Sequence, residues 1–484
     1  MVYPKKVLHW SNDKEIQSSS GLFFPKYNPA TGKILAEVTK GTKADIEQII
    51  SSAENAFDGW KNTPVIKRSD ILRNAVVLIQ ERKDEIAQIV ALESGKSQKA
   101  ASGEIDAAIE CGYFFAGEGR RYSGEILPSA QHNRSVQLIR QSIGTGALIT
   151  PFNNPMAGIA WKAFPALLCG NTVVTKSHED TPYTGVWFAQ ILKEAGLPKG
   201  VYSVAQGLGS EIGSALVEDS RIKFISFTGS LETGRYIAKT GGKDLKKVSI
   251  ESGGKNPFVV CDDADLEKAV SLAVSSAFVD AGQRCAAASR IIAFSSIYDK
   301  FKEKFLEKVN KLKVGTENND DFGAIINKKR LHQILSDVKG AVSRGATLLS
   351  GGYQLMSRNG YFMAPTVLEN VSPTDGISYK EIFGPVVILY GAKDLEEAIF
   401  LANNSTYKLT GAIHTKNINR AQEFINRYQA GVVRVNGPTF GSEPHMPFGG
   451  VGLSGNGWRE PGAKALDFYS DWKQVSIDYD SSQV

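Results

Sequence analysis

Cysteine is scarce in this chain, which contains only four in 484 residues. None of the four belongs to a C-x-x-C pair, so the sequence does not indicate a zinc site or a thioredoxin-type redox site. A disulfide framework is a feature of small secreted domains, and this chain is too long to need one. The cysteines therefore predict a protein of the reducing cytoplasm, without a metal site.

Long apolar runs are also missing. No stretch approaches the about 18 apolar residues that a membrane-spanning helix needs, and residues 1–10 lack the apolar core of a signal peptide. Lys and Arg number 56 against 51 Asp and Glu, and no basic stripe carries interleaved aromatic residues. The sequence therefore predicts neither a membrane partner nor a nucleic-acid partner.

What the chain does contain is an ordinary globular composition, with 42% hydrophobic and 22% charged residues. At roughly 150 residues per domain, its length predicts about three folding units. Glycine is frequent, at 47 residues, and many of these glycines stand in short turns. Because glycine lets the backbone approach a ligand closely, this pattern is typical of a protein with a binding cleft.

Helix-like and strand-like segments alternate along the first half of the chain. Apolar residues at helical spacing predict helices over residues 44–60 and 71–92, and another helix is expected from about residue 231. Short apolar runs predict buried strands over residues 147–150, 172–175, 224–227, 248–251 and 258–261. Such alternation predicts a mostly parallel sheet that helices cover on both faces.

The alternation begins again near residue 254. A helix is expected over residues 263–279, a strand over 290–294 and a helix over 298–312. The predicted fold class is therefore α/β with two such units. Residues 134–142 and 472–478 fit neither unit, because their apolar residues alternate as in strands; each is expected to pair outside its own domain, at an oligomer edge.

One cysteine stands in a setting that favours chemistry. Cys285 lies in the run GQRCAAAS, with small residues on one side and the cation of Arg284 on the other. A positive neighbour favours the thiolate, which is the nucleophilic form of cysteine. Cys111, Cys169 and Cys261 lie in apolar runs, where a buried cysteine acts as a small hydrophobic residue.

A nucleophilic cysteine usually needs a base. The chain has six histidines, none near Cys285 in sequence, so a Cys–His hydrolase stays an open alternative without support of its own. Glu251 ends a predicted strand and precedes Ser252-Gly253-Gly254, which puts an acid where strand ends form a cleft. By itself, such a glutamate is more often a solvated surface residue.

A turn directly follows the predicted strand 147–150, with the sequence TPFNNP from Thr150 to Pro155. The side chain of Asn153 can donate an N–H to a developing oxyanion. An Asn-Pro turn that hydrogen-bonds only its own backbone is an equal alternative. The motif alone does not decide between the two.

One glycine-containing turn is a candidate for binding phosphate, and a second misses the dinucleotide pattern and does not by itself predict a site. The run FTGSLETG, residues 227–234, joins a strand to a helix whose N–H groups could face a pyrophosphate. It lacks the G-x-G-x-x-G spacing, and GLGSEIG at residues 207–213 misses that spacing by one residue. After the strand 172–175, Lys176 and Glu179 could hydrogen-bond a ribose diol, and the acid would oppose a 2′-phosphate.

Taken together, these segments resemble the NAD(P)-dependent aldehyde dehydrogenase superfamily. The similarity runs in order from NPATG at residues 28–32 to FGG at residues 448–450, so it covers almost the whole chain. Each motif is weak alone, and the set at these spacings is highly specific. The activity implied is oxidation of an aldehyde to a carboxylic acid, through a thiohemiacetal and a thioester on the cysteine.

The resemblance implies a role for each motif. Cys285 matches the family's nucleophile, Glu251 its general base and Asn153 its oxyanion donor, while Glu460 resembles a second acid of a proton relay. The implied cofactor is NAD, with NADP as the alternative. The residues implied to bind this cofactor are Thr150, Pro151, Phe152, Lys176, Glu179, Gly209, Phe227, Gly229, Ser230, Glu381 and Phe383.

The resemblance also implies a fold, with a Rossmann-type cofactor domain, a second α/β catalytic domain and a β flap for oligomerisation. The dinucleotide-binding domain is expected over residues 1–122 and 144–253, and the catalytic domain over 254–451. The oligomerisation segment is expected over residues 123–143 and 468–484. A homodimer or homotetramer is the expected assembly.

Three residues depart from the family's pattern. Asn154 replaces the usual aromatic residue, and Ser252 replaces the usual leucine that follows the general base. His178 stands where a small residue or proline is common. None of the three removes a reacting group, but Asn154 and Ser252 put the shape of the pocket and the mobility of Glu251 in question.

Two features of the sequence favour a small semialdehyde that carries a carboxylate. Arg284 could pair with a substrate carboxylate, although it could equally turn outward into an ion pair. Residues 282–290, 360–365 and 435–439 are similar to the α-ketoglutaric semialdehyde branch of the family, with succinate semialdehyde enzymes nearby. This similarity implies a substrate such as α-ketoglutaric semialdehyde.

Other features favour an aromatic aldehyde. The run VGLSG at residues 451–455 resembles benzaldehyde-like members of the family. Trp161 and Phe440 could line an apolar tunnel, although aromatic residues near a cleft more often belong to the core. A glyceraldehyde-type substrate is a further alternative.

Two other classes of protein stay open. A coenzyme A-acylating member of the family would release the thioester to a thiol, but a retained Glu251 favours water. The other alternative is a protein that is not an enzyme, a non-catalytic scaffold or binding protein on the same fold. The joint presence of Cys285, Glu251 and Asn153 argues against it.

Overall fold

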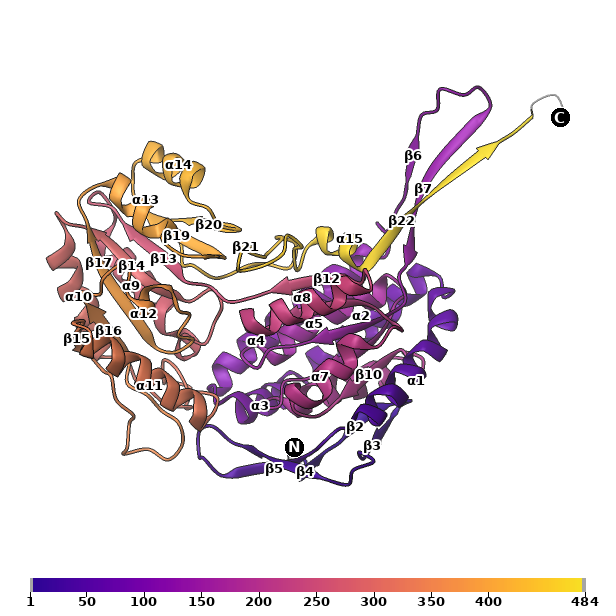
Figure 1. The fold of residues 1–484 in the computed structure, drawn as a ribbon, viewed down its shortest axis with the longest axis horizontal. Coiled ribbons are helices and arrows are strands. Elements are labelled where there is room, and N and C mark those ends of the chain that lie inside the picture. The colour runs from indigo at the N-terminus through magenta and orange to yellow at the C-terminus, as the bar shows by residue number, and fades with distance from the viewer. Residues whose placement is uncertain (1–2, 481–484) are drawn as a thin grey trace.

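The computed structural model describes residues 3–480. Figure 1 shows two α/β lobes side by side, with a long β arm that projects from the first lobe. The chain enters the second lobe after residue 251 and returns to the first through its C-terminal segment. The predicted α/β class is confirmed, while the exact domain boundaries stay a prediction.

The sheet of the first lobe has seven strands in the order β12-β11-β8-β9-β10-β2-β3. Five strands are parallel: β8 (Thr145–Ile149), β9 (Thr172–Lys176), β10 (Tyr202–Ala205), β11 (Ile222–Thr228) and β12 (Lys247–Glu251). Two antiparallel strands, β2 (His9–Ser11) and β3 (Lys14–Ile16), extend one edge. The chain passes from β8 to one side and returns to β11 on the other, and ligands bind at such a reversal, beyond the carboxyl ends of the strands.

Eight helices accompany this sheet: α1 (Lys43–Lys61), α2 (Val65–Glu81), α3 (Lys83–Ser94), α4 (Gln98–Glu118), α5 (Pro155–Leu168), α6 (Pro182–Glu194), α7 (Gly209–Glu218) and α8 (Leu231–Lys243). The single helix predicted over residues 71–92 is wrong, because the chain leaves helical geometry at Arg82, between α2 and α3. The apolar spacing continues through the break, so periodicity gives no sign of it. Arg82 instead turns its guanidinium to Glu194 of α6.

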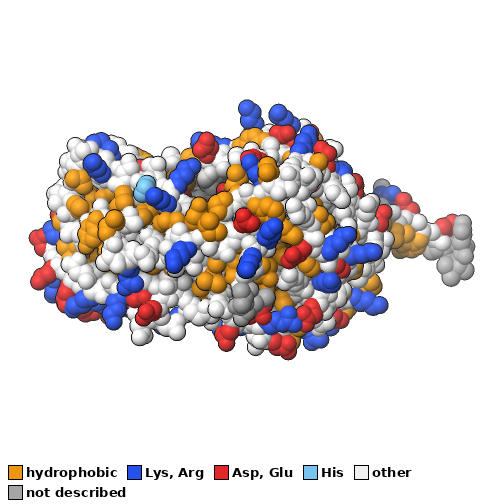
Figure 2. All heavy atoms as spheres, turned by 90° about the horizontal axis from the view of Figure 1, so that it is seen from below, with side chains coloured by type: hydrophobic (Ala, Val, Ile, Leu, Met, Phe, Trp, Pro, Cys, Tyr) orange, Lys and Arg blue, Asp and Glu red, His pale blue; other side chains and the backbone are white. Residues whose placement is uncertain are grey.

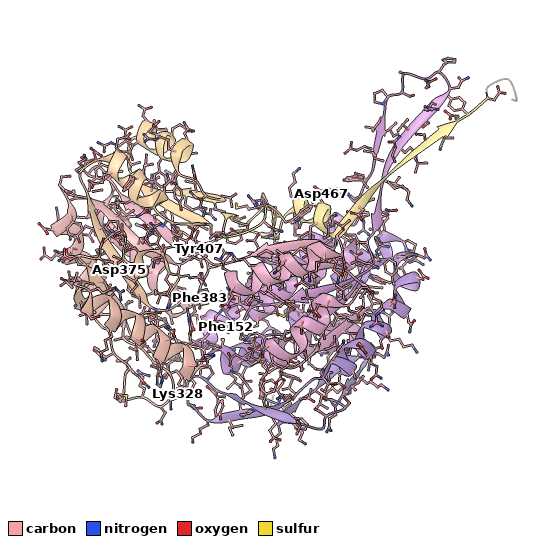
Figure 3. All side chains as sticks on the ribbon, in the orientation of Figure 1. Phe152, Lys328, Asp375, Phe383, Tyr407 and Asp467 are labelled. Atoms are coloured by element: carbon pink, nitrogen blue, oxygen red, sulfur yellow. The ribbon has the colours of Figure 1, made fainter. Side chains whose placement is uncertain are left out.

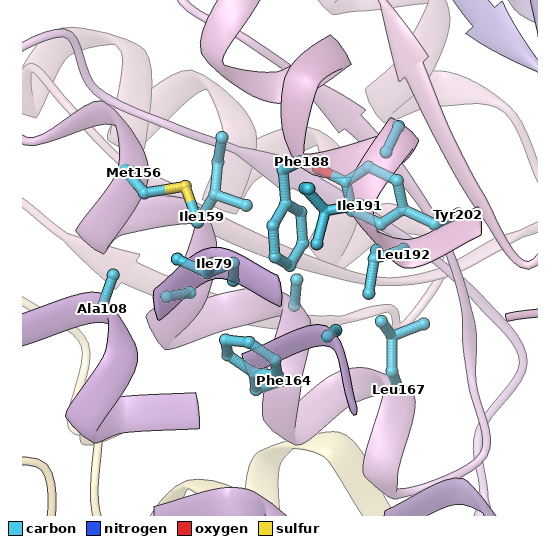
Figure 4. Close-up of a cluster of buried hydrophobic side chains, with 14 of the residues drawn as sticks. Ile79, Ala108, Met156, Ile159, Phe164, Leu167, Phe188, Ile191, Leu192 and Tyr202 are labelled. Atoms are coloured by element: carbon cyan, nitrogen blue, oxygen red, sulfur yellow. The ribbon is translucent and has the colours of Figure 1, made fainter. Parts of the chain in front are cut away.

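The core of the first lobe lies between α5, α6 and the sheet. Figure 4 shows Phe164 and Phe188 from these helices beside Tyr202 of β10, among aliphatic side chains. The ring centroids of Phe164 and Phe188 lie 5.6 Å apart, and those of Phe188 and Tyr202 lie 5.3 Å apart, both edge to face. This packing makes the sheet a rigid support for the loops at its carboxyl edge.

The second lobe is built on another seven-stranded sheet, in the order β15-β16-β17-β14-β13-β19-β20. Its strands are β13 (Asn256–Val260), β14 (Ala288–Phe294), β15 (Thr347–Ser350), β16 (Thr366–Glu369), β17 (Val386–Ala392), β19 (Thr410–His414) and β20 (Val432–Val435), parallel except for β15. Its helices are α9 (Leu266–Phe278), the 3-10 turn η1 (Val279–Gly282), α10 (Tyr298–Asn310), α11 (Lys328–Ser343), α12 (Gly376–Tyr379), α13 (Leu395–Asn403) and α14 (Ile418–Arg427). The elements predicted near residues 263, 290 and 298 correspond to α9, β14 and α10.

The β arm consists of β6 (Glu125–Leu127), β7 (Arg134–Ser142) and β22 (Ser470–Asp478). Strand β22 pairs with β7 in antiparallel register from Ser470 opposite Ser142 to Asp478 opposite Arg134. The two odd segments of the sequence therefore pair with each other. Residues 1–2 and 481–484, which fall in the predicted cofactor domain and oligomerisation segment, lie outside the described residues.

The remaining elements are short: β1 (Lys6–Val7), β4 (Phe23–Tyr27), β5 (Ile34–Thr39), β18 (Tyr407–Lys408), β21 (Val451–Gly452), η2 (Ala463–Ala465) and α15 (Leu466–Tyr469). Figure 2 shows one face of the molecule, on which basic and acidic side chains are interspersed. Within residues 3–480, no helix is long and apolar enough to cross a membrane. The same residues contain no cluster of three His, Cys, Asp or Glu side chains that could hold a metal ion.

Candidate active site

The candidate site lies where the carboxyl edge of the first sheet meets loops of the second lobe. Phe152 follows β8, and its ring centroid lies 5.6 Å from that of Phe383 in the second lobe. Figure 3 shows these two residues between the lobes. The ring centroid of His178, after β9, lies 5.2 Å from that of Phe152. The predicted cofactor residues Phe152 and Phe383 are therefore in direct contact.

Cys285 lies in a turn between η1 and β14, and the turn is tightly held. The side-chain amide of Asn256 donates to the carbonyls of Cys285 at 2.7 Å and Ala287 at 2.9 Å. The hydroxyl of Thr439 donates to the carbonyl of Ala286 at 2.6 Å. A Cβ at Gly254 would lie only 2.4 Å from the carbonyl oxygen of Cys285, so this position requires glycine. These contacts fix the backbone and leave the Cys285 side chain partly open.

The four cysteines differ in exposure. Cys111, Cys169 and Cys261 are buried, and Cys285 alone is partly exposed. Burial raises the pKa of Cys285 to about 12, helped by the carboxylates of Glu381 and Glu251 and opposed by Arg284. The cation of Arg284 therefore acts against burial and two acids, and it does not by itself favour the thiolate. Deprotonation of this thiol needs a base within reach.

Glu251 is placed to be that base. It ends β12 with 5% of its surface exposed, and neither carboxylate oxygen accepts a hydrogen bond of normal geometry from the described residues. Burial and the charge of Glu460 raise its pKa well above the ordinary value, although Lys162 and Arg459 oppose this shift. Glu251 also raises the pKa of Cys285, so the two side chains share one electrostatic environment. A buried carboxyl without a partner is costly, and such groups concentrate at functional sites.

A buried polar network lies behind Glu251. The ammonium of Lys162 donates to Glu460 at 2.7 Å and to the hydroxyl of Ser226 at 2.8 Å. Ser226 donates to the second oxygen of Glu460 at 2.6 Å, and Tyr469 donates to the same oxygen at 3.3 Å. Lys162 and Glu460 are almost fully buried, so their charges act on Glu251 with little screening from solvent.

Asn153 lies in the turn between β8 and α5, where it is buried. Its side chain makes no hydrogen bond to any of the residues the structure describes, so its amide N–H groups are free to serve a ligand. The backbone beyond the turn is anchored, because Glu104 accepts hydrogen bonds from Met156 at 2.8 Å and Ala157 at 3.3 Å, in the first turn of α5. The structure therefore presents Asn153 on a fixed support.

Lys176 and Glu179 come together beyond the end of β9. The ammonium of Lys176 donates to Glu179 at 2.9 Å. A Cβ at Gly209, the first residue of α7, would lie 3.9 Å from that ammonium. Burial alone would raise the pKa of Glu179, but His178 and Lys176 lower it to about 2, so the acid is ionised.

The next strand end brings Phe227, Gly229 and Ser230 to the same edge. The N–H of Gly229 donates to the carbonyl of Glu251 at 3.1 Å, which ties the glycine turn to the base. Ser230 caps α8 by accepting from the N–H of Thr233 at 3.3 Å. Thr150, directly after β8, donates its N–H to the carbonyl of Lys176 at 3.3 Å, and Pro151 is the next residue.

Glu381 reaches this site from the second lobe. It accepts a hydrogen bond from the N–H of Gly254 at 2.9 Å, and a Cβ at Gly253 would lie 1.9 Å from its carboxylate. Both glycines after Glu251 are thus required by close neighbours. Burial raises the pKa of Glu381 to about 7, while the Gly254 N–H, Arg330 and Lys255 lower it.

The groups at the carboxyl edge of the first sheet could together bind a nicotinamide dinucleotide. Lys176 and Glu179 offer a donor and an acceptor to a ribose diol, and Gly209 leaves space beside them. The N-terminus of α7 carries no side-chain cap, which leaves backbone N–H groups for a phosphate. Glu381 offers a carboxylate to a second ribose.

Of the three residues predicted for the substrate, Arg284 and Phe440 contact each other beside Cys285. The Nε of Arg284 donates to Asp280, and its guanidinium lies 4.9 Å from the ring centroid of Phe440. No hydrogen bond to a described residue engages the two terminal nitrogens of Arg284, and 28% of the side chain is exposed. Trp161 packs edge to face with Phe448, at 5.6 Å between centroids.

Sequence reasoning missed several residues that shape this site. Asn256 and Thr439 hold the Cys285 turn from positions distant in sequence, and no local signal marks them. Lys162 did carry a signal, because it is the only charge within the apolar helix α5. A charged residue in such a helix is seldom buried without a partner.

Comparison with known proteins agrees with this geometry. The family model described as "Aldehyde dehydrogenase family" matches residues 16–475. The chain is 36% identical over 476 residues to the α-ketoglutaric semialdehyde dehydrogenase of Bacillus subtilis, covering 97% of this chain and 98% of that one. It is 38% identical over 468 residues to the 2,5-dioxopentanoate dehydrogenase of Saccharolobus solfataricus, covering 96% and 98%.

A solved structure is similar over the same length. Betaine aldehyde dehydrogenase from Staphylococcus aureus, in complex with NAD+, superimposes with a TM-score of 0.95 at 32% identity. The match covers 97% of this chain and 94% of that one. These comparisons confirm the resemblance that the sequence motifs indicate.

Proposed function

This chain belongs to the aldehyde dehydrogenase family and oxidises aldehydes with NAD(P), and on that premise we propose that Cys285, Glu251 and Asn153 carry out the reaction on a small carboxylated semialdehyde. One observation carries the catalytic assignment. A partly exposed cysteine and a buried, unpaired glutamate lie close enough for the acid to raise the pKa of the thiol.

The first step is addition of Cys285 to the aldehyde. Glu251 takes the proton of the thiol, and the sulfur bonds to the carbonyl carbon, so that the carbonyl oxygen becomes an oxyanion. The free amide of Asn153 and the backbone N–H of Cys285 are the donors for this oxyanion. One such donor is worth about 10²–10³ in rate.

The second stage releases the carboxylic acid product. When bound, the nicotinamide ring of NAD(P) supplies the hydride acceptor, and the carbon held by Cys285 becomes a thioester. Lys176, Glu179, Gly209 and Glu381 would hold that cofactor. Glu251 next releases the thiol proton to solvent. It then removes a proton from water as the water oxygen bonds to the thioester carbon, and the Cys285 sulfur leaves and takes that proton. Lys162 favours the charged form of Glu251, and Glu460 favours its neutral form.

Two observations support a semialdehyde as substrate. The relatives from Bacillus subtilis and Saccharolobus solfataricus are named for aldehydes that carry a carboxylate. Arg284 stands beside the nucleophile with both terminal nitrogens unengaged by described residues, so it can meet a carboxylate while Asp280 holds its Nε. An aromatic aldehyde is the second candidate, because the ring of Phe440 contacts Arg284 and one relative, from Antirrhinum majus, is named as a benzaldehyde dehydrogenase. A glyceraldehyde-type substrate is supported by one relative alone, a D-glyceraldehyde dehydrogenase of Thermoplasma acidophilum.

Arg284→Ala tests the substrate. We expect kcat/KM for α-ketoglutaric semialdehyde to fall about 10- to 100-fold, the worth of a hydrogen bond to a charged group. A neutral aldehyde of the same chain length, assayed beside it, should lose about 3-fold or less by the same reasoning. Equal losses for the two aldehydes would mean that Arg284 supports the loop and does not recognise a carboxylate.

Glu179→Gln tests the cofactor preference. We propose that NAD is preferred, because an ionised Glu179 repels a 2′-phosphate. The variant is expected to raise the ratio of kcat/KM with NADP to that with NAD by about 10-fold or more, since the repulsion is lost. Glu211→Gln, which alters an exposed acid of α7 paired with Lys40, serves as the matched control. A ratio unchanged from wild type would refute the preference.

The other classes are separated by simple measurements. An acyl-CoA product on addition of coenzyme A would reveal an acylating enzyme. A non-catalytic scaffold would give no NAD(P)H with any aldehyde of a broad panel.

Assembly and compartment complete the proposal. The β arm carries exposed apolar side chains, including Ile126, Ile139 and Trp472, which supports a homodimer or homotetramer built through this arm. All four cysteines are free thiols, in keeping with a cytoplasmic enzyme.

A further inference from the structure

The backbone just before Cys285 is strained. Asp280, Ala281 and Gly282 are three successive residues in the left-handed region, with φ values of 55°, 57° and 65°. Residues with a Cβ rarely adopt this conformation, and it persists only where surrounding contacts impose it. A Cβ at Gly282 would lie 2.3 Å from the carbonyl oxygen of Gly384, so the turn also packs closely against the segment that precedes β17 in the same lobe.

Asp280 is the anchor of this turn. Its carboxylate is buried, with 3% of the side chain exposed, and it accepts from Arg284. The ammonium of Lys96, itself buried, lies 3.8 Å from the same carboxylate oxygen. The strained backbone is therefore tied down by a carboxylate between two cations.

Lys96 also contacts the turn that carries Asn153. Its ammonium donates to the side-chain carbonyl of Asn154 at 2.8 Å and to Glu104 at 2.9 Å. Glu104 in turn caps the first N–H groups of α5, directly after that turn. Asn154 occupies the N-cap position of α5 but makes no capping bond, because its side chain is engaged by Lys96. Asn154, which departs from the family pattern, therefore makes a specific hydrogen bond with Lys96.

The two turns also face each other across a small cavity. Its lining includes Lys96, Asn153, Asp280 and Gln283, with Phe152 at one side. Lys96 therefore lies where the turn of Asn153, the proposed oxyanion donor, meets the turn that leads to Cys285.

We infer that Lys96 is a positioning residue, whose ammonium joins the turn that carries Asn153 to the turn that carries Cys285. This inference rests on the proposed function for the roles of those two side chains. Lys96 touches neither the thiol nor the aldehyde. It keeps the oxyanion donor and the sulfur in one arrangement, so that one aldehyde carbonyl can meet both.

Lys96→Met tests the inference, because it keeps the length of the side chain and removes its charge. We expect kcat per active site to fall about 10²-fold, the cost of misplacing reacting groups by about 1 Å, with KM changed by about 3-fold or less. Active sites are counted by peptide mass as molecules in which iodoacetamide labels Cys285 but not Cys111, Cys169 or Cys261, because an unfolded molecule exposes all four thiols. A variant that only folds less well loses labelled sites and kcat together, so its kcat per site stays constant.

The rate of labelling is the second readout, and it needs neither aldehyde nor cofactor. Release of the strained turn is expected to expose the half-buried thiol, so iodoacetamide should label Cys285 faster in Lys96→Met than in wild type. Cys111, Cys169 and Cys261 should stay unlabelled, which separates loop release from global unfolding. The matched control is Lys83→Met, since Lys83 also joins α3 to α4, through an exposed pair with Asp106.

The outcomes are distinct. Wild-type kcat per site or a wild-type labelling rate in Lys96→Met overturns the inference. If that variant does not fold, Asn154→Leu takes its place, with an expected loss of about 10-fold in kcat per site from one missing charged hydrogen bond. A wild-type protein that oxidises no aldehyde would defeat the proposed function, and the labelling rates would still decide the role of Lys96.

Discussion

Cys285→Ala is expected to reduce kcat by at least about 10⁴-fold, because removal of the nucleophile from a covalent enzyme leaves only the contributions of binding and oxyanion donors. The affinity for NAD should be unchanged, since Lys176, Glu179 and Gly209 lie on other strand ends and keep their contacts. Stopped-flow or steady-state formation of NADH gives the first quantity. Quenching of protein fluorescence by NAD gives the second.

The matched control is Cys261→Ala, which removes a buried thiol from the same lobe. It should keep kcat per folded molecule near the wild-type value. If Cys285→Ala retained more than a small fraction of wild-type turnover, the covalent route would be wrong. If it lost NAD binding together with turnover, the effect would belong to folding and another variant, Cys285→Ser, would have to separate the two.

Glu251→Gln is expected to stop the cycle after the thioester has formed. A burst of about one NADH per active site should persist if another base or hydroxide takes the thiol proton, while steady-state kcat falls about 10²–10⁴-fold, the usual worth of a general base. Gln keeps the shape of the side chain and removes its basicity. Rapid-quench measurement of NADH against time separates the burst from the slow turnover.

The pH dependence follows from the surroundings of Glu251. Burial and the negative charge of Glu460 raise its pKa well above the ordinary value, so the side chain is neutral below that pKa and basic above it. The rate of thioester hydrolysis in the wild type should therefore rise with pH through that pKa. In Glu251→Gln the rise should be absent or follow hydroxide alone.

A matched control is Glu218→Gln, because Glu218 is an exposed acid of the first lobe that binds Tyr236. It should leave both the burst and kcat unchanged. A Glu251→Gln enzyme with wild-type kcat would contradict the role of Glu251 as a base. A burst that falls as much as the steady-state rate would place its essential step at the thiol and not at the thioester.

Much of the fold follows from local pattern. The strands β8, β9, β11 and β12 are short apolar runs, and α1 carries its apolar stripe between a Thr42–Asp45 capping box and Asn62. Such signals depend on neighbouring residues only. The break at Arg82 gives none, because the apolar spacing of α2 and α3 is continuous through it, and only the backbone geometry at Arg82 separates the two helices.

The residues of the site likewise fall into those that a local sequence pattern reveals and those that it does not. Glu251 and its two following glycines can be singled out from sequence, since a strand-end acid and a glycine pair are adjacent. Why each glycine is needed depends on Glu381 and Cys285, which come from other parts of the chain. The pKa of Cys285 also depends on Glu381 and Glu251, which are distant in sequence, so the local signal of Arg284 is only one of its causes. Lys96 and Asp280 could not be connected before the structure joined them.

The most direct test of the account is the mass of Glu251→Gln after it reacts with NAD and α-ketoglutaric semialdehyde. The account predicts a covalent adduct equal to the aldehyde less two hydrogen atoms, located by peptide mapping on Cys285 and released by hydroxylamine. An unmodified protein after NADH has formed, or an adduct on any other residue, would contradict it.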